Sequence, residues 1–264
     1  MQRKFITNLA LVLALNLLIK PFWILGIDRA VQNAVGTEQY GFYYSIFGFS
    51  FLLNILLNLG ITNFNNKNIS QNNHLLSKHF ASIVLLRILL TVIFTIVTLL
   101  AGLVIQYTPD MMKMLVAVIF NQILISFIMY LRSNLAGLHL FKTDSIISVL
   151  DRLIMIAICA GLLWKYSTPG SFQIKWFVYA QTAAYLITMG ITLFIVIGKA
   201  KVRKFTWRWP FFVMILKKSY PYAVLVLLMT FYNRIDSVMI ERLLPFRVGA
   251  NEAGIYASAY RLLD

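Results

Sequence analysis

Long apolar runs limit this chain to very few folds. Seven of them are long enough to cross a bilayer as helices, which takes about 20 residues. Charged residues make up only 12% of the chain, too few to cover the surface of a soluble protein of 264 residues. The sequence therefore predicts an all-α fold, a polytopic transmembrane helical bundle. The predicted spans are 5–27, 41–61, 80–106, 112–138, 144–165, 174–198 and 219–244, and an eighth begins near 253 and is unfinished at Asp264.

The net charge of +15 does not indicate a nucleic-acid partner. The cations lie mostly between the apolar runs, on alternate sides, rather than on one face of a folded domain. The sequence contains no catalytic constellation, no phosphate-binding glycine loop and no zinc-like spacing of its histidines. Its single cysteine, Cys159, lies in an apolar run and suits a packing role. We therefore expect no enzyme activity, no cofactor and no bound metal.

Basic residues are concentrated in every second connection between the runs. The positive-inside rule assigns these connections, and the N-terminus, to the cytoplasm. Six spans return the chain to the side on which it began, so a second block of six would have the same orientation. The basic residues on that side are Arg3, Lys4, Lys67, Lys78, Lys142, Lys199, Lys201, Arg203, Lys204, Arg208, Lys217 and Lys218.

A short motif occurs twice, each time at the start of the second helix of a block. Gly41-Phe42-Tyr43-Tyr44-Ser45 is echoed by Gly254-Ile255-Tyr256-Ala257-Ser258. Two related halves are typical of transporters. We therefore predict a six-helix lobe over 1–198, a linker over 199–218 and the start of a second lobe over 219–264, which would make this chain an N-terminal fragment.

The predicted linker mixes cations with aromatic side chains. Trp207, Trp209, Phe211 and Phe212 are interleaved with lysines and arginines over 199–218. That composition suits an amphipathic helix lying against anionic headgroups on the cytoplasmic side, which makes membrane lipids a partner. A charged stop signal followed by an aromatic belt explains the same residues, and both readings are compatible.

Polar residues inside the first two spans suggest a cavity. Asn16 and Lys20 share one face of the first span, and Pro21 predicts a bend beside the lysine. A cation beside a kink suits an anionic ligand, although a lysine can also extend toward the headgroups. Asn54 and Asn58 share a face of the second span. Similar stripes on the fourth and sixth spans favour a water-accessible central cavity, with helix packing as the alternative. They are Gln122, Ser126, Tyr130 and Asn134 on the fourth span and Gln181, Tyr185, Thr188 and Thr192 on the sixth.

The seventh span carries Asn233, Arg234 and Asp236. The planar guanidinium of Arg234 suits a diphosphate, and Asp236 is placed to meet another partner, with a structural ion pair as the alternative. Three further residues, Arg132, Asp151 and Arg152, are interpreted as a structural ion-pair group near the cytoplasmic end. Arg87 lies near the cytoplasmic end of its span, and its side chain is interpreted as reaching toward the headgroups.

Segments near both ends of the chain, among them Lys20–Ile24 and Tyr232–Ile240, carry a family resemblance. They resemble the polysaccharide flippases of the multidrug/oligosaccharidyl-lipid/polysaccharide exporter superfamily. The resemblance implies two six-helix lobes around a central cavity, in a multi-pass protein of the bacterial inner membrane. It also implies alternating-access export of an undecaprenyl-diphosphate-linked glycan for cell-surface polysaccharide. Lys20, Arg29 and Arg234 fit the cationic cavity of such proteins, while Asn58 replaces a common aspartate. The matching segments are Lys20–Ile24, Gly26–Arg29, Gly36–Gly41, Leu57–Thr62, Tyr232–Ile240 and Ala253–Tyr256.

The main alternative is a multidrug or small-molecule exporter of the same superfamily, coupled to H⁺ or Na⁺. Cationic drugs would favour acidic residues in the cavity, whereas the first span carries Lys20. A lipid-linked glycosyltransferase would need an acidic catalytic site in a large external loop, and the predicted external loops are short. A structural assembly subunit would explain the helices but not the polar stripes.

Overall fold

The computed structural model describes residues 12, 14–166, 172–200, 207 and 209–260, and within helices it leaves out the side chains of 233, 234, 246, 247 and 258. The described residues form helices and no strand, which confirms the all-α fold class. Five helices are long and apolar enough to cross a membrane, and a bent helix pair raises this number to six. The predicted first span falls partly outside the described residues.

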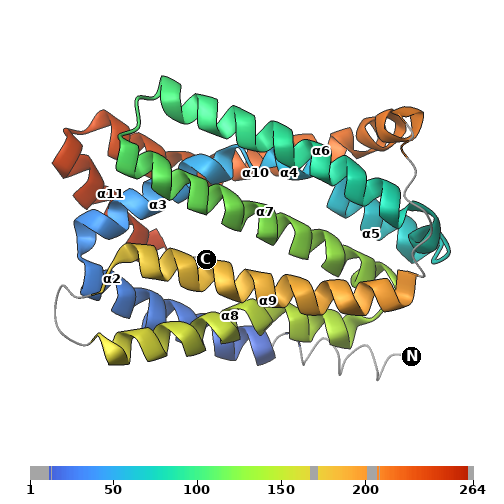
Figure 1. Cartoon of the computed structure of the whole chain (residues 1–264), viewed down its shortest axis with the longest axis horizontal. Helices are drawn as coiled ribbons and strands as arrows, with labels where there is room; N and C mark the ends of the chain where they lie inside the picture. The colour runs from blue at the N-terminus through green and yellow to red at the C-terminus, as the bar shows by residue number, and fades with distance from the viewer. Residues whose placement is uncertain (1–11, 13, 167–171, 201–206, 208, 261–264) are drawn as a thin grey trace.

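The long helices run antiparallel and side by side (Figure 1). Their connections gather at two ends of the bundle. We call the end that holds the α5–α6, α7–α8 and α9–α10 connections the basic end, and the other the opposite end. The elements are η1 (Phe22–Asp28), α2 (Arg29–Val35), α3 (Thr37–Leu52), α4 (Ile55–Asn58), α5 (Ile61–Gln71), α6 (Leu75–Val104), α7 (Pro109–Gly137), α8 (Phe141–Lys165), α9 (Ile174–Ala200), α10 (Trp209–Leu243) and α11 (Phe246–Tyr260).

The first span is irregular where Pro21 predicts a bend. Directly after this proline the helix widens into the π-helical stretch η1, and it then continues as α2 to Val35. Proline cannot donate the backbone hydrogen bond of a regular helix, so a local change of hydrogen-bond pattern is expected beside it. The helix therefore extends beyond the predicted end at residue 27.

The second span is broken, whereas the sequence predicts one continuous helix over 41–61. Leu59 and Gly60 adopt left-handed backbone conformations, with φ of 42° and 74°. A left-handed residue ends a helix, and glycine adopts this conformation without strain. The span also changes direction by 43° between Thr37–Leu52 and Ile55–Gln71, at residues 53–54. Its last part, α5, continues to Gln71.

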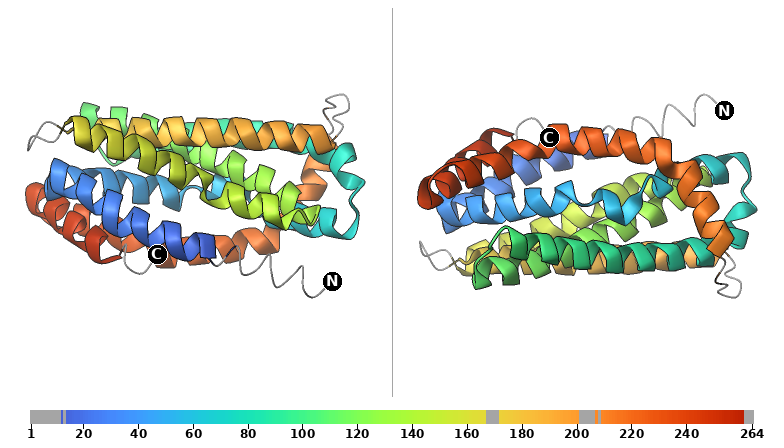
Figure 2. Two further views of the ribbon diagram at one scale, coloured as in Figure 1. Left: turned by 90° about the horizontal axis from the view of Figure 1, so that it is seen from below. Right: turned by 90° about the horizontal axis from the view of Figure 1, so that it is seen from above.

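Helix α10 is one helix from Trp209 to Leu243 with Pro221 inside it. Figure 2 shows its first part turned across the basic end of the bundle before the rest runs toward the opposite end. Proline disrupts the hydrogen bond to the residue four positions earlier, which explains a bend at this point. The structure therefore joins residues 209–218 to the predicted seventh span. The assignment of 199–218 as a linker between lobes stays a prediction, and residues 201–206 and 208 lie outside the described part.

The two copies of the repeated motif lie on helices that cross, α3 and α11 (Figure 1). The crossing is close because it uses the glycines of both copies. A Cβ on Gly41 would overlap the carbonyl oxygen of Ala250, and one on Gly254 would overlap that of Thr37. Close backbone approach of this kind is common where small residues line a membrane helix interface.

Candidate functional site

A pocket of about 260 Å³ lies beside the break in the second span, between α4, α5, α7 and α10. Its walls mix amide and hydroxyl groups with apolar side chains, and no acidic residue lines it. Pockets with a few convergent polar groups are the usual form of ligand sites. The lining residues are Phe51, Asn54, Ile55, Asn58, Thr62, Asn63, Ile125, Ser126, Met129, Val226 and Thr230.

Asn58 organises this site because it closes the broken helix. Its side-chain oxygen accepts hydrogen bonds from the backbone N–H of Thr62 at 3.0 Å and from the Thr62 hydroxyl at 2.7 Å. It thereby satisfies one of the free N–H groups in the first turn of α5. Asn54 lies one turn earlier and donates to Gln122 on α7 at 2.7 Å. The sequence prediction that Asn54 and Asn58 share a polar site is thus consistent with their places in one pocket wall.

Arg87 lies directly behind this wall. Its side chain is 1% exposed, and its guanidinium donates to the Ser126 carbonyl at 2.8 Å and to the Thr62 hydroxyl at 3.1 Å. It also contacts Asn58 at 3.5 Å and lies over the Tyr130 ring, 5.0 Å from its centroid. All these partners are neutral, and its Nε has no hydrogen-bond partner among the described residues.

The pocket therefore has a positive electrostatic character. The N-terminus of α5 contributes the positive end of a helix dipole, and Arg87 adds a full charge that no described acid neutralises. A guanidinium keeps its charge when buried, so the charge persists at this site. Broken membrane helices whose N-terminal ends face a cavity are a known way to bind anionic groups. The arrangement favours an anion over a cation.

At the opposite end, α10 is attached to α3 and to the α6–α7 connection. The buried Glu241 accepts a hydrogen bond from Ser45 on α3 at 3.3 Å and pairs with Arg242 at 3.0 Å. The Arg242 guanidinium stacks on the ring of Tyr107, 4.5 Å from its centroid. Burial raises the pKa of Tyr107 to about 12, so the ring remains a neutral phenol at physiological pH. This cation–π contact holds α10 against the α6–α7 connection.

A comparison with protein families gives a clear match. A family model described as "Polysaccharide biosynthesis protein" covers residues 10–264. The chain belongs to this family. The match confirms the resemblance that the sequence shows to polysaccharide flippases and supports a multi-pass membrane protein. Searches of the curated proteins and of the solved structures find no match.

Three residues predicted for the site of this polysaccharide biosynthesis protein do not line the pocket. Asn16 donates to the backbone oxygen of Val12 in its own helix at 2.9 Å. Lys20 is half-buried and Arg29 is exposed, and both lie on the first span. Because this span packs against α8 rather than lining the pocket, these residues remain candidates for a separate part of a cavity.

Of the three residues predicted for the site on the seventh span, the structure describes the side chain of Asp236. Asp236 is exposed and accepts a hydrogen bond from the Tyr256 hydroxyl, in the second copy of the repeated motif, at 2.9 Å. It therefore ties α10 to α11. The side chains of Asn233 and Arg234 lie outside the described part of the structure, so their roles stay predictions.

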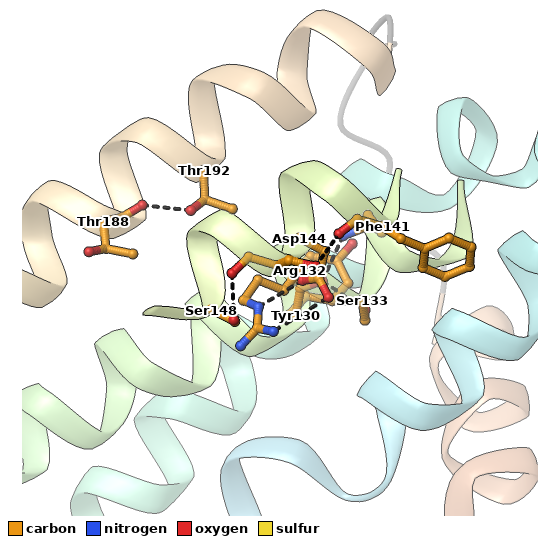
Figure 3. Close-up of polar contacts among 10 residues, drawn as sticks. Tyr130, Arg132, Ser133, Phe141, Asp144, Ser148, Thr188 and Thr192 are labelled. Carbon is orange, nitrogen blue, oxygen red and sulfur yellow. Dashed lines mark hydrogen bonds and ion pairs between the residues drawn. The ribbon is translucent and has the colours of Figure 1, made fainter. Parts of the chain in front are cut away.

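The predicted pairing of Arg132 with Asp151 is replaced by another. Figure 3 shows Arg132 paired with Asp144, and the Nε–Oδ1 distance is 2.8 Å. Asp144 lies in the first turn of α8, just across the short connection from α7, whereas Asp151 lies two turns further along. The Oδ1 atom of Asp151 has no hydrogen-bond partner among the described residues, and Arg152 is its chain neighbour. Arg132 thus forms an ion pair with Asp144 instead of the predicted Asp151.

The polar stripe on α7 is mostly a packing surface. Asn134 and Ser133 accept hydrogen bonds from Asn65 of α5, at 2.9 and 3.0 Å. Gln122 is fully buried against Asn54. On α9, Thr192 donates to the backbone of Thr188 in its own helix (Figure 3). Of the predicted α7 stripe, Ser126 lines the pocket.

Proposed function

We propose that this chain forms part of a transporter that moves a lipid-linked oligosaccharide across the bacterial inner membrane by alternating access. The cargo headgroup is an undecaprenyl-diphosphate-linked glycan, and its lipid tail stays in the bilayer. The family supports a role in polysaccharide biosynthesis. The observation that carries the proposal is the pocket at the broken second span, backed by the buried Arg87 and lined by no acid.

The chemistry of the pocket fits an anionic cargo. A diphosphate is stabilised by a helix N-terminus, by amide donors and by a nearby guanidinium. Asn58 uses its side-chain oxygen on α5 and Arg87, which leaves its amide nitrogen as a donor at the pocket wall. A cationic drug would meet a potential of its own sign here and would be repelled. The pocket therefore favours the flippase proposal over the drug exporter.

The contacts at the opposite end support alternating access. The α3–α11 crossing and the bonds of Glu241 hold α10 and α11 against α3 at this end. With the N-terminus on the cytoplasmic side, this end would be periplasmic, and the chain would represent a state closed toward the periplasm. Opening would require α3 to separate from α11.

The test uses the gene at its full length. A deletion strain is complemented with wild type, Asn58→Leu or Lys113→Gln, and lipid-linked oligosaccharide is quantified in each leaflet. We expect the deletion and Asn58→Leu to accumulate cargo in the cytoplasmic leaflet, with export lowered about tenfold by loss of hydrogen bonds to a charged group. Lys113 is exposed and, in the described part of the chain, pairs with Asp110 alone, so Lys113→Gln serves as the matched control.

Accumulation that wild type and Lys113→Gln relieve, and Asn58→Leu does not, supports the flippase and this pocket. Unchanged leaflet distribution with altered drug susceptibility in the deletion strain would overturn the proposal and favour the drug exporter. Full relief by Asn58→Leu would retain the flippase but remove the pocket from its mechanism.

A further inference from the structure

A second pocket, of about 210 Å³, lies at the basic end, away from the site beside the broken helix. It is formed where the first part of α10 turns across the bundle and meets α5 and α6 (Figure 2). Its floor is apolar and includes Ile69, Ile83 and Ile215. The polar groups that line it include Asn68 and Lys218. The pocket therefore joins an apolar base to a polar rim.

One wall of this pocket is an aromatic stack. The ring of His79 on α6 lies 4.6 Å from the ring of Phe211 on α10, at 20° between the planes. Trp207 and Trp209 lie next to this stack in the sequence and are more than half exposed, and both pack against Phe212. Exposed tryptophans of this kind are enriched where a membrane protein meets the headgroup layer. The pocket is thus placed at the level of the lipid headgroups.

The charge around the pocket has one sign. The sequence contains no aspartate or glutamate between Asp151 and Asp236, and this stretch includes all of α9 and most of α10. At the basic end, Asp144 is already paired with Arg132. Lys218 lines the pocket and its neighbour Lys217 is exposed outside it. A cationic rim above an apolar floor is complementary to an anionic lipid.

We propose that this pocket binds the headgroup of an anionic phospholipid. Lys218 pairs with the phosphate oxygens, Asn68 donates from the rim, and the isoleucine floor holds the start of an acyl chain. The bound lipid fixes the turned part of α10 against α5 and α6. This site is separate from the pocket at the broken second span, so it does not depend on the transported cargo.

Native mass spectrometry of the purified full-length protein tests the site with dioleoylphosphatidylglycerol as the probe and dioleoylphosphatidylcholine as the neutral lipid. We expect Lys218→Gln to lower affinity for the anionic lipid about tenfold or more, because it removes a charge-assisted hydrogen bond. Lys217→Gln removes the same charge from the same helix outside the pocket. It should lower affinity at most about fivefold, the effect of a cation near a lipid surface.

A third variant, Met214→Trp, fills the pocket without a change of charge and should abolish specific binding, while circular dichroism checks that helix content is kept. Equal losses in Lys218→Gln and Lys217→Gln would mean general surface attraction and overturn the site. The same holds for equal binding of the two lipids, or for Met214→Trp binding like wild type. Displacement of the phospholipid by undecaprenyl diphosphate at lower concentration would assign the pocket to the cargo and overturn the proposal.

Discussion

Arg87 is the residue whose role the sequence least reveals. Its position near the end of an apolar run is typical of an arginine that reaches to the headgroups. Its partners come from α4, α5 and α7, which only the packed bundle brings together. One signal was available: Asn58, Thr62 and Ser126 are polar positions in neighbouring spans and need a donor when buried. The sequence pattern singles out Asn58 and Ser126, but neither Thr62 nor the common donor of these groups.

Replacement of Arg87 tests whether its charge serves transport or only the stability of the fold. Arg87→Met keeps the volume and removes the charge, and Thr62 still donates to Asn58 at 2.7 Å. The variant lifts the cost of a buried charge without an acidic partner but leaves the Ser126 carbonyl without this donor, so we expect the melting temperature to change little. Cargo export should fall at least about tenfold. The two readouts are fluorescence-detected melting in detergent and the leaflet assay; a lower melting temperature with normal export would mean that the arginine is structural.

At the scale of the helices, the sequence predicts the long spans well and the breaks less well. The predicted limits of the third to sixth spans agree with α6, α7, α8 and α9 to within a few residues, because a continuous apolar run is a strong signal. Pro21 correctly marks an irregularity of the first span, the π-helical stretch that follows it. The break at Leu59 and Gly60 was missed, since an isolated glycine in an apolar run marks either a break or close packing. Here it marks both.

Gly60 meets α10 on both sides of Pro221. A Cβ on Gly60 would overlap the carbonyl oxygen of Ser219 and lie 2.7 Å from the backbone nitrogen of Ala223. The break of the second span therefore contacts α10 at its internal proline. This contact couples the shape of the second span to that of α10, and the pocket lies beside it.

Gly60→Ala should therefore lower the free energy of unfolding by about 2 kcal/mol or more, through left-handed strain and overpacking. Gly190→Ala is the matched control. Gly190 lies within α9 and a Cβ there would meet nothing within 4 Å, so alanine should be neutral or stabilise by up to about 1 kcal/mol. Melting curves of both variants in the same detergent decide the point, and equal stability of Gly60→Ala and wild type would show that α10 moves aside without cost.

At the scale of the whole molecule, the repeated motif predicted two related blocks of helices. In the structure, the two copies of the motif lie in contact. They lie on α3 and α11 and cross at Gly41 and Gly254. The sequence could not show that the copies touch, since contact depends on how the helices of both blocks pack. The side chain of Gln32 adds a hydrogen bond to the backbone oxygen of Gly254 at 2.9 Å. The crossing is thus a defined interface between the first block and the start of the second.

If this interface opens and closes during transport, a covalent link across it must stop the cycle. Thr37 on α3 donates a hydrogen bond to the side chain of Asn251 on α11, so Thr37→Cys with Asn251→Cys places two thiols together. We expect oxidation to cross-link them and to abolish export in a full-length protein whose other cysteines, Cys159 included, are replaced. Reduction should restore export. Thr37→Cys with Glu252→Cys is the control, because Glu252 is exposed and lies about 100° further round the helix. Export that continues through the cross-linked protein would mean that α3 and α11 stay together throughout, and that cargo leaves by another route.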